Sequence, residues 1–220
     1  MIEQIKRLAR NNFLYDLVKK KKNKNDLKKW STERKSFVGP LPHLMKQFTI
    51  KDYAAKFNCF TLIETGTFEG DMVEANLDNF TNIYSIELDD YYFKRAFRKF
   101  RNNPNVQLIN GDSGVELGKL LLSLHEDCVF WLDGHYSAGK TARGELDTPI
   151  LSEILSIFNH PMKNPVILID DARLFNGEND YPKLDDFIAQ IGKLTDKFEV
   201  EVYNDIIRIT PARLLISNNG

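Results

Sequence analysis

The chain has 220 residues, of which 42% are hydrophobic and 28% charged, a balance typical of one soluble globular domain with a full-sized core and not of a disordered protein. No apolar run approaches the roughly 20 residues needed to cross a bilayer, and the first residues do not form a secretory signal. The two cysteines, Cys59 and Cys128, cannot form a disulfide scaffold, so we expect a reduced, cytoplasmic protein.

Charge is distributed unevenly along the chain. Residues 1–35 contain twelve basic and four acidic residues, a net charge of +8, which leaves −9 for residues 36–220 out of a total of −1. We predict a basic helical extension over residues 1–42, and we favour a solvated helix over a surface for nucleic acid, anionic lipid or an acidic glycan. Its apolar residues recur at near-helical spacing, so part of it is expected to pack on the main domain or on a second subunit in a homodimer. Gly39-Pro40 and Pro42 mark a joint, and the main domain is expected over residues 43–220.

Strands and helices alternate after this joint. We expect a short helix over 50–57 with Thr49 as its N-cap. The expected strands are 60–64, 82–87, 106–110, 128–132, 166–169, 198–203 and 206–210. The expected helices between them are 71–77, 91–101, 114–124, 150–158 and 185–194. Fully apolar strands that alternate with helices predict an α/β fold, a mostly parallel seven-stranded sheet with helices on both faces. The last two strands, joined by Asn204-Asp205, predict a C-terminal antiparallel hairpin.

Glycine and polar residues follow the first three strands, at the edge where open parallel sheets bind ligands. Gly66 and Gly70, after the first strand, allow a tight turn and a close approach of the backbone. Glu87 ends the second strand, where a carboxylate accepts hydrogen bonds from the ribose hydroxyls of an adenosine-type ligand. After the third strand, the side chains in Gly111–Ser113 could contact an adenine edge or cap the next helix. Because three strand ends carry suitable residues, we favour a ligand site over three separate structural turns.

Over roughly residues 45–215 the sequence resembles the class I S-adenosylmethionine-dependent methyltransferases, through IETGTFEG, YSIELDD, INGDS and the terminal EVEVYNDIIRI. Phe68 replaces a glycine of the common family loop, a departure shared by metal-dependent O-methyltransferases similar to catechol O-methyltransferase. The resemblance implies a Rossmann-like fold and S-adenosyl-L-methionine as the cofactor. It assigns Glu64 and the Gly66 to Gly70 backbone to the methionine part of the cofactor, Glu87 to the ribose, and Asp112 with Ser113 to the adenine region. The full set of cofactor-binding residues that it implies is Glu64, Thr65, Gly66, Thr67, Phe68, Gly70, Asp71, Glu87, Leu88, Gly111, Asp112, Ser113 and Asp133.

Three aspartates follow the fourth and fifth strands: Asp133 in VFWLDGHY, and Asp170 with Asp171 in VILIDDAR. Adjacent parallel strands could bring them together, and three carboxylates at one place are costly without a cation between them. Hard oxygen ligands favour Mg²⁺, with Ca²⁺ or Mn²⁺ as alternatives. Since successive strand residues face opposite sides, the alternative is that Asp170 and Asp171 cap or bridge to Arg173. The catechol-type enzymes have two aspartates and an asparagine at the matching positions, so the resemblance implies a more acidic site here.

The polar segment HYSAGKTARGELDTP, after the fourth strand, is long enough to be a substrate-binding lid. Asp133, His135 and Lys140 are the candidate catalytic residues. His135 is the first choice for the base because its unperturbed pKa lies near neutrality, although a loop histidine bonded to a carboxylate is an equal alternative. Lys140 and Arg143 could contact a carboxylate or phosphate on the acceptor, or pair with nearby acids. The catechol-type enzymes have a lysine at the position of Tyr136, so that role does not carry over.

The sequence therefore predicts an S-adenosylmethionine-dependent O-methyltransferase that acts on a small polyhydroxy acceptor, a sugar or natural product, with the help of a divalent cation. The alternatives are a metal-independent methyltransferase that uses His135 and a cofactor-binding protein without turnover. Methylation of nucleic acid is disfavoured because no Asn/Asp-Pro-Pro-aromatic tetrad follows the fourth strand.

Overall fold

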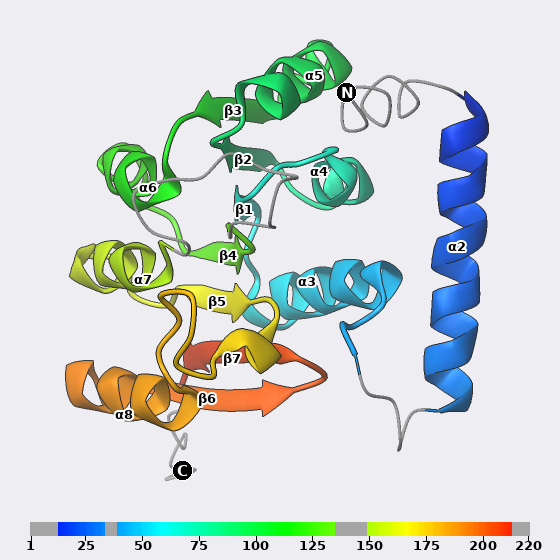
Figure 1. Cartoon of the computed structure of the whole chain (residues 1–220). Helices are drawn as coiled ribbons and strands as arrows, with labels where there is room; N and C mark the ends of the chain where they lie inside the picture. Colours follow the sequence, from blue (N-terminus) through cyan, green and yellow to red (C-terminus); the bar gives the residue numbers. More distant parts are fainter. Residues whose placement is uncertain (1–12, 34–38, 135–148, 213–220) are drawn as a thin grey trace, which may run out of the picture. The chain divides into compact units, whose positions relative to one another are not determined.

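A computed structural model describes residues 13–33, 39–134 and 149–212 of the chain (Figure 1). The chain divides into two compact units, residues 1–49 and 50–220. Helix α2 (Phe13–Thr32), in the first unit, runs without interruption through the lysine-rich stretch. Among the described helices, none combines the length and the apolar character that crossing a membrane requires.

Helix α3 (His43–Phe57) begins seven residues earlier than the sequence analysis expected. The backbone N–H groups of Met45 and Lys46 donate to the carbonyl oxygen of Pro42, so the first turn forms directly after this proline. The prediction that Thr49 is an N-cap is wrong. Its hydroxyl lies inside the helix and donates to the Met45 carbonyl oxygen, four residues earlier, at 2.9 Å. A threonine side chain can be satisfied in this way without ending a helix.

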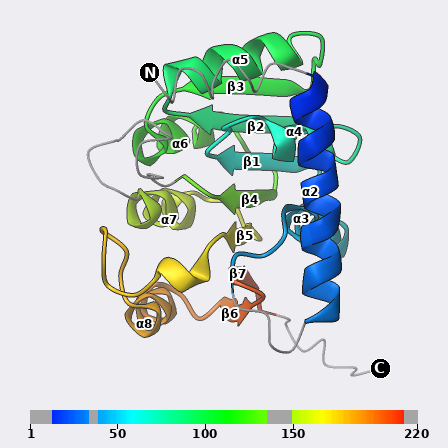
Figure 2. The same ribbon diagram turned by 45° about the vertical axis from the view of Figure 1, so that its right-hand side comes forward.

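The second unit contains a seven-stranded sheet in the order β3-β2-β1-β4-β5-β7-β6 (Figure 2). Strands β1 to β5 pair in parallel, and β7 pairs antiparallel with both β5 and β6. The strands are β1 (Thr61–Thr65), β2 (Asn82–Glu87), β3 (Val106–Asn110), β4 (Cys128–Leu132), β5 (Val166–Ile169), β6 (Phe198–Tyr203) and β7 (Ile206–Pro211). The predicted mostly parallel sheet with a C-terminal antiparallel hairpin is confirmed.

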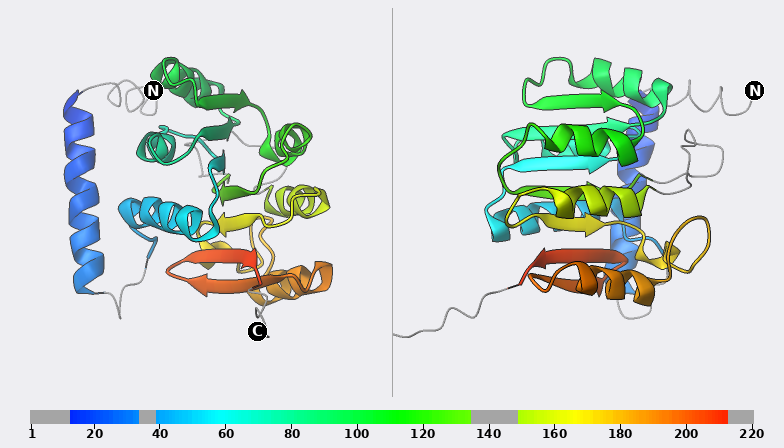
Figure 3. Two further views of the ribbon diagram at one scale, coloured as in Figure 1. Left: turned by 180° about the vertical axis from the view of Figure 1, so that it is seen from behind. Right: turned by 90° about the vertical axis from the view of Figure 1, so that its left-hand side faces the viewer.

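Helices cover both faces of this sheet (Figure 3). Helices α4 and α5 lie on one face, and α6, α7 and α8 lie on the other. Their bounds are α4 (Asp71–Asn76), α5 (Asp90–Phe100), α6 (Ser113–Leu121), α7 (Ile150–Asn159) and α8 (Leu184–Leu194), with a short 3₁₀ turn η1 (Ala172–Leu174) after β5. The predicted three-layer α/β architecture is therefore confirmed, with element bounds that differ from the expected ones by a few residues at most, apart from α3.

Burial explains the apolar strands. Every residue of β1, β4 and β5 is buried, because these strands lie inside the sheet and are covered on both faces. The edge strand β6 alternates instead between partly buried and exposed residues along its first half. The β6–β7 hairpin turns through Asn204 and Asp205, whose φ angles of 49° and 60° are those of a two-residue type I′ turn.

Candidate functional site

The order of the strands reverses beside β1, because β2 and β3 lie on one side of it and β4 and β5 on the other. Ligands of open α/β sheets bind at such a reversal, outside the carboxyl ends of the strands. The predicted cofactor-binding residues lie at this edge. Glu64 and Thr65 end β1, Glu87 ends β2, Gly111–Ser113 follow β3 and Asp133 follows β4.

The loop after β1 is held tightly between its neighbours. Gly66 has a φ of +90°, and a Cβ atom there would lie 2.6 Å from the carbonyl oxygen of Asp133. Its N–H donates to the Ile86 carbonyl oxygen of β2 at 2.9 Å. A side chain at this position would therefore collide with the end of β4, which explains the need for glycine. Gly70 is restricted similarly, since a Cβ atom there would lie 2.6 Å from the ring of Phe100.

Glu87 is fixed by the backbone of that loop. It is 5% exposed, and its carboxylate accepts the N–H of Phe68 at 2.6 Å and the N–H of Asp89 at 2.8 Å. Burial raises the pKa of Glu87, and these backbone N–H groups oppose the shift. The Phe68 backbone has a φ of +48°, and its ring packs on Tyr92 with 4.5 Å between ring centroids. A carboxylate offers about four acceptor positions, so Glu87 keeps capacity for ligand hydroxyl groups.

Glu64 is the most strongly perturbed acid of this loop region. It is 2% exposed, and the Ser85 hydroxyl donates to its Oε2 at 2.5 Å while lying 2.6 Å from the Thr67 hydroxyl. Burial raises the pKa of Glu64 to about 8, and the negative charges of Asp133, Glu87 and Asp71 add to the shift against the opposing Ser85 hydrogen bond. A positively charged group bound beside Glu64 would favour its ionised form.

The end of β3 meets the ends of β1 and β4. Asp112 caps α6 by accepting the Gly114 N–H at 2.9 Å, so the expected capping role is present. Ser113 is buried, and a Cβ atom at Gly134 would lie 3.2 Å from the Ser113 hydroxyl and 3.3 Å from the Thr65 hydroxyl. Residues from the ends of β1 and β3 therefore lie beside the short segment that leaves β4.

The remaining predicted residues are scattered around this edge or lie outside the described part of the chain. Asp71 is the first residue of α4, and Leu88 follows β2. His135 and Lys140, together with Tyr136 and Arg143, fall outside the described residues.

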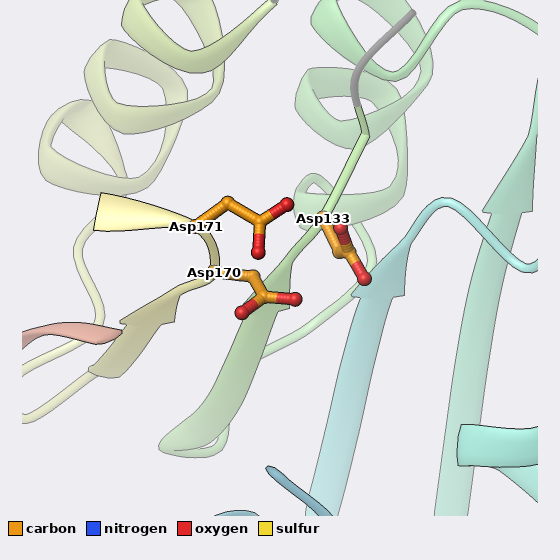
Figure 4. A group of neighbouring side chains, drawn as sticks. All are labelled: Asp133, Asp170 and Asp171. Atoms are coloured by element: carbon orange, nitrogen blue, oxygen red, sulfur yellow. The ribbon is translucent and has the colours of Figure 1, made fainter. Parts of the chain in front are cut away.

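Asp133, Asp170 and Asp171 converge at the ends of β4 and β5 (Figure 4). Each offers a carboxylate oxygen, and these oxygens all lie within 4.8 Å of one another. Asp171 has a left-handed backbone, with a φ of 56°, so the chain turns directly after β5 and does not continue the strand alternation. Three oxygen donors this close together fit a hard divalent cation such as Mg²⁺.

Arg173 contacts this cluster from η1. Its guanidinium donates to Asp171 at 2.7 Å and also forms a short ion pair with Asp205 of the hairpin turn. Asp205 in turn accepts the N–H of Ala172 on its carbonyl oxygen and the N–H of Arg173 on its carboxylate, both at 2.9 Å. The predicted bridge to Arg173 and the predicted convergence of the aspartates are thus both present in the structure.

Glu153 is a site residue that the sequence reasoning missed. It lies on α7 and is 1% exposed, and burial raises its pKa to about 7, with the charges of Asp112 and Asp133 adding to the shift. The hydroxyls of Ser113 and Thr65 oppose that shift. Glu153 lines a small hollow, partly open to solvent, together with Leu132, Asp133, Gly134, Ile150, Ile169, Asp170 and Tyr181. Its position among the buried residues Ile150, Ile154 and Ile157 of α7 was the available signal.

The sheet order and the two helical layers are those of the α/β Rossmann-like methyltransferase fold. Three solved structures illustrate the similarity. The S-adenosylhomocysteine-bound methyltransferase PaMTH1 of Podospora anserina shares 16% identity with a TM-score of 0.55, over 91% of this chain and 96% of that one. TomG of Streptomyces achromogenes, an O-methyltransferase involved in tomaymycin synthesis and solved with S-adenosylmethionine, shares 12% identity with a TM-score of 0.55, over 76% and 78%.

The third is the 23S rRNA methyltransferase ErmE, which shares 15% identity with a TM-score of 0.52, over 80% of this chain and 70% of that one. No family model and no curated protein matches the chain. At identities of 12 to 16%, these similarities establish the fold.

Proposed function

We propose that the protein is an S-adenosylmethionine-dependent methyltransferase. The observation that supports this most directly is that residues from the ends of β1, β2 and β3 share one edge of the sheet with the segment that leaves β4, with Gly66 against the Asp133 backbone and Phe68 bonded to Glu87. This edge carries a backbone turn, a buried carboxylate and a helix N-terminus. Such an edge suits a ligand with a ribose and an adenine.

In this proposal each strand end holds one part of the cofactor. The segments Glu64–Phe68 and Gly70–Asp71 would hold the methionine part, Glu87 and Leu88 the ribose, and Gly111–Ser113 the adenine region, with Asp133 as a further cofactor-binding residue. The cofactor supplies an electrophilic methyl group for an in-line displacement. The protein must align the acceptor, exclude water and remove a proton from it. A positively charged group of the ligand beside Glu64 would favour the ionised form of this buried acid.

The finer proposal is O-methylation of a small polyhydroxy acceptor, assisted by a divalent cation, as in the catechol-type enzymes. Its support is the set of three carboxylates, Asp133, Asp170 and Asp171, with oxygens within 4.8 Å of one another. A cation bound there would lower the pKa of an acceptor hydroxyl. His135 and Lys140 follow Asp133 in the sequence and are proposed to serve as the base and an acceptor contact.

A metal-independent methyltransferase is the second candidate. It is supported by the ion pair between Arg173 and Asp171, because the guanidinium already neutralises part of the acidic cluster. In this case His135 alone would accept the proton. The small-molecule acceptor is itself a proposal, since ErmE, whose name gives rRNA as its substrate, has the same fold.

The N-terminal extension, residues 1–42, is proposed to be separate from the methyltransferase domain, residues 43–220. The apolar residues of this extension would pack on a second subunit. Deletion of residues 1–42 should then convert a dimer to a monomer in sedimentation analysis, and a monomeric full-length chain would contradict the homodimer.

The cofactor proposal is tested by calorimetric titration with S-adenosylhomocysteine and by thermal unfolding. A ligand at 100 times its Kd stabilises a protein by about 2.7 kcal/mol, so the melting temperature of the wild type should rise clearly. Glu87→Ala should abolish the rise, because it removes the acceptor for the ribose hydroxyls. Glu199→Ala, at an exposed position of β6, is the matched control and should behave as the wild type. No binding by the wild type at millimolar ligand would contradict the proposal.

A further inference from the structure

We propose that Glu153 is a positioning residue of the cation site, where it accepts a hydrogen bond from a water molecule bound to a divalent cation held by Asp133, Asp170 and Asp171. This inference rests on the cation-assisted form of the proposed function. It extends that function to a residue on α7, an element that supplies none of the three aspartates.

The first support is the position of the carboxyl group. Glu153 lines the same hollow as Asp133 and Asp170, so acidic residues from α7, the end of β4 and the end of β5 border one space. Its Oε1 is buried and has no hydrogen-bond partner among the described residues. A buried oxygen without a donor is expected to be satisfied by an ordered water or a ligand.

The second support is the distance that separates direct from water-mediated binding. Ligands on opposite sides of Mg²⁺ are about 4.2 Å apart, since each bond is about 2.1 Å long. The group of oxygens within 4.8 Å of one another contains the three aspartates and does not contain Glu153. Glu153 lies outside this group, so we assign it as an acceptor for a water on the ion and not as a direct ligand.

The third support is the chemistry of the ion. Mg²⁺ takes six ligands and usually keeps several waters, and three aspartates that give one oxygen each leave three positions open. Waters on a divalent cation are strong hydrogen-bond donors, and the groups that receive those bonds fix the geometry of the ion. Glu153 supplies such an acceptor from inside the molecule, and it does so in either protonation state.

A structural role for Glu153 is the competing explanation. Glu153 occupies the buried face of α7 between Ile150 and Ile154. Glu153→Leu removes a buried acid, which favours the folded state, but it also removes the acceptor of the Ser113 and Thr65 hydroxyls, which disfavours it. The Mn²⁺ affinity, and not the melting temperature, therefore separates the two explanations.

The test is a titration with Mn²⁺, followed by electron paramagnetic resonance and calorimetry. The full-length wild type should bind Mn²⁺, and Asp133→Asn should lose this binding. Glu153→Leu should weaken Mn²⁺ binding by about 10 to 100-fold while its affinity for S-adenosylhomocysteine stays within about 2-fold. Glu153→Gln keeps an acceptor oxygen, so it should lose less, and Glu199→Gln should match the wild type.

The outcomes separate this inference from the proposed function. Mn²⁺ affinity within about 2-fold of the wild type in both Glu153 variants would overturn the role of Glu153 and leave the cation site standing. A wild type that binds S-adenosylhomocysteine but no Mn²⁺ would overturn the cation site and, with it, the role of Glu153. If Glu153→Leu fails to fold, the same comparison is made with Glu153→Gln, whose Mn²⁺ affinity must then fall measurably.

Discussion

Glu64 should make the stability of this protein depend on pH in a way that a single substitution removes. Its pKa is raised from 4.5 to about 8 in the folded protein, so the unfolded chain releases this proton at lower pH than the folded one. The stabilisation that this group contributes is present in full below pH 4.5 and is lost as the pH rises through about 8. One pKa unit corresponds to 1.36 kcal/mol, so the raised pKa should lower the free energy of unfolding by about 3 to 4 kcal/mol between pH 5 and pH 8.

The measurement is guanidinium unfolding of the wild type and Glu64→Gln at pH 5, 6.5 and 8. The glutamine side chain does not titrate. From pH 5 to pH 8 the free energy of unfolding of the wild type should therefore fall by about 3 to 4 kcal/mol relative to that of Glu64→Gln. Acids that do not interact with Glu64 cancel in the difference, whereas Asp133, Glu87 and Asp71 respond to its loss and add a smaller change. Parallel pH profiles for the two proteins would show that Glu64 has no raised pKa, and the electrostatic reasoning for this edge would be refuted.

Two further predictions concern the loop after β1 and the acidic cluster. Gly66→Ala should lower the free energy of unfolding by about 1–3 kcal/mol in guanidinium unfolding, because its Cβ atom would meet the Asp133 carbonyl oxygen in a backbone conformation that alanine disfavours. Gly192→Ala is its control, since a Cβ atom there meets nothing within 4 Å and alanine favours the helix, and equal losses in the two variants would contradict the collision. Arg173→Met should increase the Mn²⁺ affinity several-fold in calorimetry, because it removes the guanidinium charge that neutralises Asp171. An unchanged or weaker affinity would show that Arg173 does not compete with the metal.

The sheet could be predicted because its central strands carry their own signal. Residues such as Val166–Ile169 are apolar throughout, and only a strand covered on both faces accommodates such a run in this alternating chain. The hairpin could be predicted from Asn204 and Asp205, because these residue types tolerate the left-handed conformation of a type I′ turn. The prediction for Thr49 was wrong because a threonine hydroxyl can either cap a helix N-terminus or donate to the carbonyl oxygen four residues earlier. The local sequence does not decide between these two roles.

The candidate site was only partly visible in the sequence. The strand ends pointed to Gly66 and Glu87, because topology alone brings such residues to one edge. The relation of Asp170 to Asp171 could not be derived, since it depends on a left-handed turn that the strand pattern does not specify. Glu153 was not predicted because it lies inside a helix and not at the end of a strand. Only the packed structure shows which residues face the buried side of that helix. The roles of His135 and Lys140 stay predictions.

The contacts of Asp205 have a consequence for biosynthesis. The turn that joins the last two strands holds both Ala172 and Arg173, and Arg173 reaches Asp171. While residues 198–211, which form the hairpin, are still being translated, the parallel strands can already have assembled, yet the contacts from Asp205 to Ala172 and Arg173 are missing. The acidic cluster would thus reach its final geometry only after the β6–β7 hairpin has emerged and folded.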